Sequence, residues 1–182
     1  GRIGFVEHNV YANMPLGAEM HSLAWMVLLG TKESWFLGGS IGKTVIASYG
    51  LIGAMIVGGI ASRYAGAIGG WIGASSYLSS PGIAEVSRHG LIDGVVACYA
   101  IAAYSILSRW REDRSSQQLS PWSYGIVLGW ILGAAASCKY TTVPMLVLPG
   151  LAISLWMIWQ RPSVQAKRRW VVGAIVIGIG LS

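Results

Sequence analysis

The sequence predicts an all-α protein, a polytopic bundle of transmembrane helices. Of its 182 residues, 54% are hydrophobic and only 11% are charged, whereas soluble domains carry about 25% charged residues. The mean hydropathy is +0.57. The chain also contains 25 glycines and 9 tryptophans. Glycine lets membrane helices approach closely and tryptophan gathers at the two interfaces, so a soluble glycine-rich core is disfavoured.

Apolar runs define the expected helices in chain order. Residues 16–30 contain Glu19 and His21, which interrupt the apolar pattern too early for a span of roughly twenty residues. We therefore expect a helix that lies at the membrane interface. The later apolar runs predict spans at residues 41–61, 65–80, 90–107, 122–138 and 143–159, and a further one from residue 170. The Gly66xxxGly70 and Gly69xxxGly73 spacings predict close approach of a neighbouring helix.

This pattern divides the chain into two regions. Residues 1–40 are expected to form an external loop and a juxtamembrane helix. Residues 41–182 are expected to form a transmembrane bundle of about five complete spans and one truncated span. Because the chain starts without Met and stops inside an apolar run, we expect an internal piece of a longer protein, inactive on its own.

The distribution of basic residues predicts an orientation. Most of the 13 Lys and Arg residues fall in one set of alternate loops, which should be cytoplasmic because positive charge accumulates there. Topology then accounts for the net charge of +6, and no nucleic-acid partner is expected. Residues 1–40, residues 79–93 and Lys139 all fall on the non-cytoplasmic side. We expect a multi-pass integral membrane protein, placed in a bacterial inner (plasma) membrane.

Residues 79–93 gather Glu85, Arg88, His89 and Asp93 between two apolar runs. Ionisable groups inside a membrane protein are functional by default. Arg88 is the first candidate, because a guanidinium matches a lipid phosphate bidentately. Its alternatives are a snorkelling interfacial arginine or an ion pair with Glu85 or Asp93. At the start of a span, Asp93 would hold Arg88 or favour the helix N-terminus.

Lys139 interrupts two apolar spans. A lone lysine there is costly unless it meets water, a carboxylate or a phosphate, which makes Lys139 a second candidate for binding phosphate. Residues 38–44 resemble a nucleotide phosphate loop, but Leu37 stands where that motif needs glycine. Nucleotide binding is therefore not expected. Cys98 and Cys138 fall inside predicted spans and form no CxxC or disulfide framework.

Acid, base or metal chemistry could come from Glu7, His8, Glu19 and His21. Their spacing is unspecific, since there is no HExxH, and Glu19 and His21 diverge on a helix. We keep Glu7, Glu19 and His21 as weak catalytic candidates. No cofactor and no metal site are predicted, and the sequence leaves a divalent-metal requirement open.

Three short segments, in their order and spacing, resemble the GT-C class of glycosyltransferases that use polyprenyl-phosphate sugars. That class contains the protein O-mannosyltransferases and the lipid A aminoarabinose transferases. Residues 11–19 resemble a proline-containing segment of the first external loop. Residues 87–93 resemble a Ser-Arg to Asp motif that opens a membrane helix, and residues 133–141 a glycine-rich helix that ends in lysine.

The resemblance implies a partial GT-C fold and sugar transfer on the non-cytoplasmic side, by inverting displacement at the anomeric carbon. The donor would be a polyprenyl-phosphate sugar in the membrane lipid, and the acceptor a protein, lipid or glycan. Arg88 and Lys139 would hold the donor phosphate. The supporting residues would be Tyr11, Glu85, His89 and Asp93. The family's acidic base usually precedes the proline segment, so the resemblance implies that it lies upstream of residue 1.

Two other classes of membrane protein share parts of this pattern. A secondary transporter also shows glycine-rich spans and isolated charges, but it is expected to contain an internal repeat, and residues 41–80 do not repeat in residues 122–160. In a non-catalytic membrane scaffold, Arg88, Asp93 and Lys139 would only pair with one another. Both classes stay open as alternatives to the enzyme.

Overall fold

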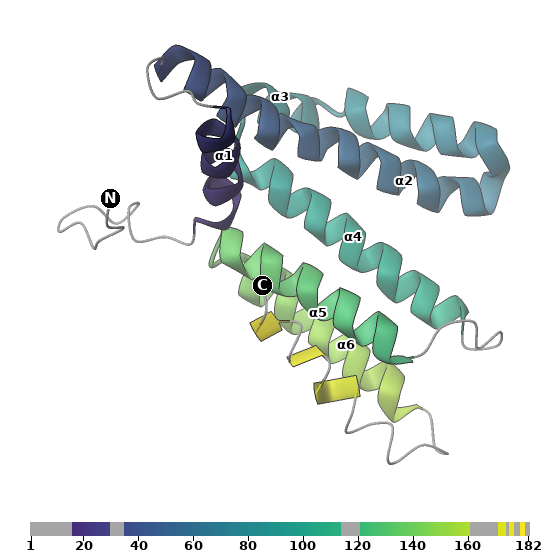
Figure 1. The fold of residues 1–182 in the computed structure, drawn as a ribbon. Coiled ribbons are helices and arrows are strands. Elements are labelled where there is room, and N and C mark those ends of the chain that lie inside the picture. The colour runs from purple at the N-terminus through teal and green to yellow at the C-terminus, as the bar shows by residue number, and fades with distance from the viewer. Residues whose placement is uncertain are drawn as a thin grey trace.

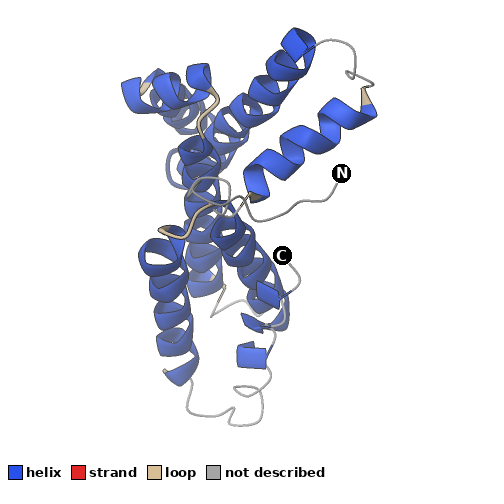
Figure 2. Cartoon of the chain, turned by 90° about the vertical axis from the view of Figure 1, so that its left-hand side faces the viewer, coloured by secondary structure: helices blue, strands red, loops and turns tan. Residues whose placement is uncertain are grey.

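The fold of the chain is entirely helical in the part that the structure describes. The computed structural model describes residues 16–29, 35–113, 121–160, 171–173, 175–176 and 179–180. No strand occurs in those ranges (Figures 1 and 2), so the predicted all-α class is confirmed. The elements are α1 (Gly17–Leu28), α2 (Trp35–Ser79), α3 (Pro81–His89), α4 (Ile92–Glu112), α5 (Pro121–Cys138), the short π-helix η3 (Val143–Val147) and α6 (Leu148–Trp159).

Helix α2 is a helical hairpin rather than one continuous rod. Ala65 and Gly66 have non-helical backbone angles, and Gly66 has a φ of 64°, which only glycine adopts without strain. The chain reverses there, and the two arms of α2 lie side by side in Figure 1. The sequence predicted a connection at residues 62–64 and a new span from Ala65. The reversal instead falls at Ala65 and Gly66, because the left-handed angle needs the glycine.

Glycines bring the two arms of the hairpin into contact. A Cβ added to Gly70 would lie 3.1 Å from the carbonyl oxygen of Gly58, and one added to Gly73 would lie 2.8 Å from the Cβ of Ala61. The close approach predicted from the glycine spacings is confirmed at these positions. The same crowding joins α3 to the first arm, since a Cβ on Gly50 would lie 2.7 Å from the Ser87 hydroxyl.

Helices α4, α5 and α6 build the larger hydrophobic core. Leu128 and Leu132 of α5 are fully buried, between Ala103 of α4 and Met157 of α6. At the far end of this core, the rings of Trp110 and Tyr124 stack with centroids 6.0 Å apart. These helices form the lower layer in Figure 1, below α2 and α3.

The exterior of the bundle suits a membrane. Within α2 and α4, Phe36–Ser79 and Ile92–Glu112 are long and apolar enough to cross a bilayer, while Trp122–Cys138 and Val143–Trp159 form shorter apolar helices. Large apolar side chains point outward, among them Met55, Ile68, Trp71, Trp130 and Met145. Lipid tails are as apolar as such side chains. The predicted number of complete spans and the division at residue 40 stay predictions.

An ionic contact ties the hairpin tip to the end of α4. Arg63 donates to Glu112 at 2.9 Å, and the Tyr64 hydroxyl donates to the other carboxylate oxygen at 2.9 Å. This contact lies at the opposite end of α4 from Asp93, in the first turn of that helix. It fixes the orientation of the hairpin relative to α4.

We expect Gly66→Ala to destabilise the protein by about 1–3 kcal/mol, because a φ of 64° with a ψ of −166° is essentially restricted to glycine. No atom lies within 4 Å of the added methyl group, so a clash would not contribute. Thermal unfolding in detergent measures the change.

The matched control is Gly59→Ala. Gly59 also has no atom within 4 Å of an added Cβ, but it lies inside a helix, where alanine is favoured over glycine by about 1 kcal/mol. The control should leave the melting temperature unchanged or raise it. Equal melting temperatures for the two variants would contradict the assignment of the turn.

Candidate functional site

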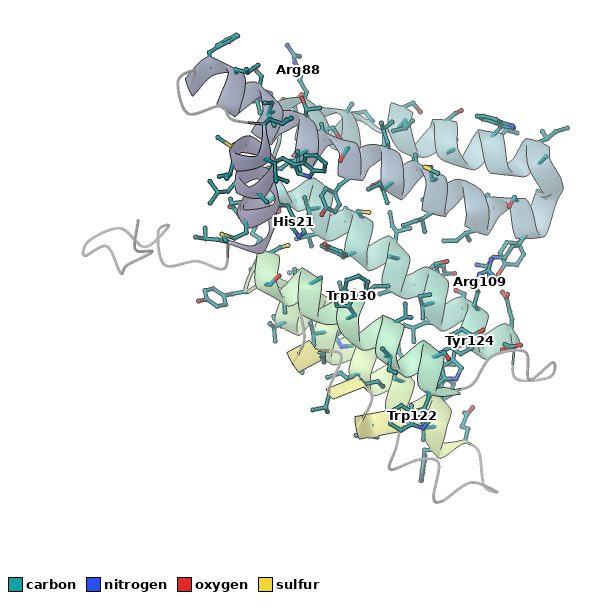
Figure 3. The ribbon with its side chains drawn as sticks, in the orientation of Figure 1. His21, Arg88, Arg109, Trp122, Tyr124 and Trp130 are labelled. Atoms are coloured by element: carbon teal, nitrogen blue, oxygen red, sulfur yellow. The ribbon has the colours of Figure 1, made fainter. Side chains whose placement is uncertain are left out.

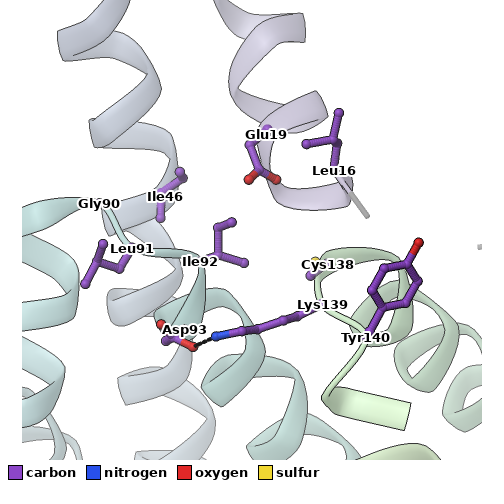
Figure 4. Close-up of a pocket in the computed structure, with 10 residues that line it drawn as sticks. All are labelled: Leu16, Glu19, Ile46, Gly90, Leu91, Ile92, Asp93, Cys138, Lys139 and Tyr140. Carbon is purple, nitrogen blue, oxygen red and sulfur yellow. Dashed lines mark hydrogen bonds and ion pairs between the residues drawn. The ribbon is translucent and has the colours of Figure 1, made fainter. Parts of the chain in front are cut away.

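An open pocket lies at the end of the bundle where α1, α2, α4 and α5 meet. Its volume is ≈ 370 Å³, within the range of small-molecule sites, about 300–1,000 Å³. The lining residues, drawn in Figure 4, are Leu16, Glu19, Ile46, Gly90, Leu91, Ile92, Asp93, Cys138, Lys139 and Tyr140. An apolar lining with a few convergent charged groups is typical of a ligand site.

An ion pair between Asp93 and Lys139 spans one wall of the pocket. The Lys139 ammonium donates to a carboxylate oxygen of Asp93 at 2.7 Å (Figure 4). Asp93 lies in the first turn of α4, where a carboxylate favours the helix N-terminus. The side chains are 43% and 57% exposed for Lys139 and Asp93, so both reach water. The expected carboxylate partner of Lys139 is found, and the alternative pairing of Arg88 with Asp93 is wrong.

The turn after α5 holds Lys139 in place. Helix α5 ends at Cys138, and the buried Thr142 hydroxyl lies 2.9 Å from the carbonyl oxygen of Ala135 and 2.6 Å from that of Lys139. Such a bond satisfies one of the carbonyl groups that a helix leaves without a partner at its C-terminus. Because these hydrogen bonds tie the turn to the last turn of α5, the backbone of Lys139 is held in one position.

Glu19 enters the pocket from α1. Its Oε2 atom is buried and has no hydrogen-bond partner among the described residues, and Figure 4 shows the carboxylate directed into the pocket. The start of α1 is held close to α5, since a Cβ on Gly17 would lie 2.8 Å from the carbonyl oxygen of Ser137. A buried carboxylate oxygen without a partner is costly. A hydrogen-bond donor on a bound ligand would satisfy it.

His21 is directed away from Glu19 and does not line the pocket. A hydrogen bond of 2.7 Å joins its Nδ1 to the Tyr49 hydroxyl, and the two rings stack. The Tyr49 ring in turn contacts that of Tyr99 on α4, with centroids 5.9 Å apart. His21, labelled in Figure 3, therefore links α1 to α2, and through Tyr99 to α4. The predicted divergence of Glu19 and His21 is confirmed.

The other charged residues of the 79–93 stretch lie outside the pocket lining. On α3, His89 bonds to Glu85 at 2.9 Å in an exposed i, i+4 pair, so the alternative pairing of Arg88 with Glu85 is also wrong. Arg88 is exposed and projects away from the bundle in Figure 3. Only residues 90–93 of that stretch reach the pocket.

Some of the sequence-based candidates cannot be placed, and one network was missed. Glu7, His8 and Tyr11 lie outside the described residues. The contact between Tyr49 and Tyr99 was not predicted. The sequence indicates it only through two tyrosines, each with a polar hydroxyl, inside apolar runs. Within the described ranges, no three His, Cys, Asp or Glu side chains come together as they would for a metal ion.

Comparison with protein families gives one match. The family described as dolichyl-phosphate-mannose-protein mannosyltransferase matches residues 22–181. The matched range contains Arg88, Asp93 and Lys139 and begins after Glu19. Comparison with curated proteins and with solved structures gives no match.

We expect a weak coupling between Asp93 and Lys139. Half-exposed ion pairs contribute up to about 1 kcal/mol, because water screens them. A double-mutant cycle with Asp93→Asn and Lys139→Met, followed by denaturant unfolding, should give a coupling energy of that size. The same cycle on Arg63 and Glu112, where the arginine side chain is only 19% exposed, should give a larger value. A larger coupling energy for Asp93 and Lys139 than for Arg63 and Glu112 would contradict the expectation that the less exposed pair is screened less.

Proposed function

Because the chain belongs to the dolichyl-phosphate-mannose-protein mannosyltransferase family, we propose that it transfers a hexose from a polyprenyl-phosphate donor to an acceptor hydroxyl at the α1–α4–α5 pocket. The family is one of GT-C type membrane glycosyltransferases, which favours the enzyme over the transporter and scaffold alternatives. The observation that carries the proposal is the convergence of Glu19, Asp93 and Lys139 in one pocket.

Lys139 has the position and charge to bind the donor phosphate. When the bond between the anomeric carbon and the phosphate oxygen breaks, the leaving phosphate gains negative charge. A cation fixed beside it stabilises that charge most when water is excluded. Asp93 holds the Lys139 ammonium at 2.7 Å beside the pocket, which positions the cation for a phosphate. Arg88 is exposed on α3 and projects away from the bundle, so it would contact the phosphate only at the surface, outside the pocket.

Among the described carboxylates Glu19 is best suited to act on the acceptor, and we propose it in place of the base that the family resemblance implies upstream of residue 1. Asp93 is paired with Lys139, whereas the Oε2 of Glu19 has no partner within the described ranges. In the proposed step Glu19 accepts the proton of the acceptor hydroxyl as its oxygen attacks the anomeric carbon. The bond to the phosphate breaks with inversion, and the phosphate leaves with the bonding electrons.

We place the reaction on the non-cytoplasmic side of a bacterial inner membrane, in a multi-pass protein. Arg63, Arg109 and Arg111 all lie at the opposite end of the bundle from the pocket, near the Glu112 contact. Positive residues favour the cytoplasmic side, which supports an outward-facing pocket. A protein, lipid or glycan hydroxyl would reach it from that side.

We expect Lys139→Met to lower sugar transfer about 100-fold in the full-length protein in proteoliposomes, because the leaving phosphate loses a fixed cation. Arg88→Met should lower it about 10-fold, since an exposed charged hydrogen bond contributes less. The control is Arg109→Met, an exposed arginine at the far end of α4 (Figure 3), which should keep wild-type transfer. If both test variants keep wild-type sugar transfer and wild-type melting temperatures, Lys139 and Arg88 do not bind the donor phosphate.

We expect Glu19→Gln to lower kcat about 100-fold while the KM for the donor stays close to wild type, because the amide cannot accept the acceptor proton. His21→Gln on the same helix is the control. It removes the tether to Tyr49, so it should lower the melting temperature more than it lowers kcat. A Glu19→Gln enzyme with wild-type kcat would exclude Glu19 as the base.

A further inference from the structure

A lysine outside the pocket lining makes an unusual contact with the pocket rim. Gly90 ends α3 with a φ of 65° and borders the pocket. A Cβ on Gly90 would lie 3.2 Å from Cγ, 3.3 Å from Cα and 3.4 Å from Cβ of Lys43 on α2. The stem of Lys43 therefore runs directly against the backbone of the turn that forms the rim.

The register of α2 sets the direction of the Lys43 ammonium. Ile46 lines the pocket, and Lys43 precedes it by three residues, so the two share one face of the helix. Side chains on a helix lean toward its N-terminus, and the first carbons of the Lys43 side chain lie against Gly90, which lines the pocket. Lys43 is exposed, so its charge remains accessible beyond the turn.

The charge around the rim is unbalanced. Asp93 pairs with Lys139, and Glu85 pairs with His89. Across the described ranges, neither Lys43 nor Arg88 takes part in an ion pair. Lys43 of α2 therefore lies against the Gly90 turn without a described counter-charge. An anion at the pocket mouth would supply that counter-charge.

The geometry points to Lys43 as a binding residue for the phosphate of a membrane-embedded polyprenyl lipid, held at the mouth of the pocket. This inference rests on the proposed function, because it takes the same donor as ligand and adds a contact to it. Lys139 would meet the phosphate from inside the pocket, and Lys43 from the rim across the Gly90 turn. The headgroup of a bulk anionic phospholipid offers the same phosphate chemistry, so the test must separate the two sources.

The test measures equilibrium binding of a polyprenyl phosphate without sugar to the full-length protein in nanodiscs. One set of discs contains phosphatidylcholine alone, and the other contains added phosphatidylglycerol. In phosphatidylcholine, Lys43→Met should raise the Kd about 10-fold, as expected for the loss of one charged hydrogen bond. Lys43→Arg should restore binding, and Arg109→Met, which removes a distant exposed charge, should not change it.

A second pair of variants tests the contact itself. Gly90→Ala places a methyl group 3.2 Å from Cγ of Lys43 and should raise the Kd. The matched control is Gly66→Ala, which introduces alanine at nearly the same φ, 64°, but meets no atom within 4 Å, and it should leave the Kd unchanged.

Two results would overturn the inference. One is a wild-type Kd for Lys43→Met in both kinds of disc. The other is an effect seen only with phosphatidylglycerol, which would assign Lys43 to bulk lipid. If Lys139→Met weakens binding and Lys43→Met does not, the proposed function stands without Lys43. If the wild-type protein binds no polyprenyl phosphate, the proposed function fails with it.

Discussion

The ion pair between Asp93 and Lys139 is the contact around which the charged groups of the pocket are arranged. It connects the first turn of α4 to the residue that follows α5, at 2.7 Å. Each charge lies where an apolar helix begins or ends, and either alone would be expensive near a bilayer. Paired, they hold the two helix ends together and still reach water. Glu19 and the Gly90 turn border the same space because α1 and α3 pack around this junction.

The helices with long apolar runs could be predicted from the sequence, because the length of the run determines them. Helix α3, Pro81–His89, lies in the charged stretch between two predicted spans and was not predicted. The predicted span at residues 122–138 differs from α5, Pro121–Cys138, by one residue. The span predicted at residues 90–107 begins close to α4 but ends early, since the helix continues to Glu112. The prediction places Arg109 and Arg111 beyond the end of the span. They instead lie in the last turn, where basic side chains are favoured by the helix dipole.

The contacts of the charged residues could not be predicted, because a charge in a sequence does not specify its partner. Asp93 and Arg88 are close in sequence, yet Asp93 pairs with a lysine 46 residues away. Glu85 has its partner one helical turn away in His89. The reversal of the chain at Gly66 could not be predicted either, because the GxxxG spacing that contains Gly66 also predicts an ordinary interface between two helices. Its φ is a property of the folded turn.

The contact between Gly50 and Ser87 has a consequence for the outermost cation. Helix α3 has only 9 residues, too few to be stable alone in water, and all of its residues are at least partly exposed. Its position is therefore set by its neighbours: the first arm of α2, where the missing side chain of Gly50 makes room for Ser87, and α4, where a Cβ on Gly94 would lie 3.0 Å from Cγ1 of Val86. Arg88 is the next residue. The position of that guanidinium therefore depends on two glycines in other helices, and the contacts that place the cation involve no ionisable group.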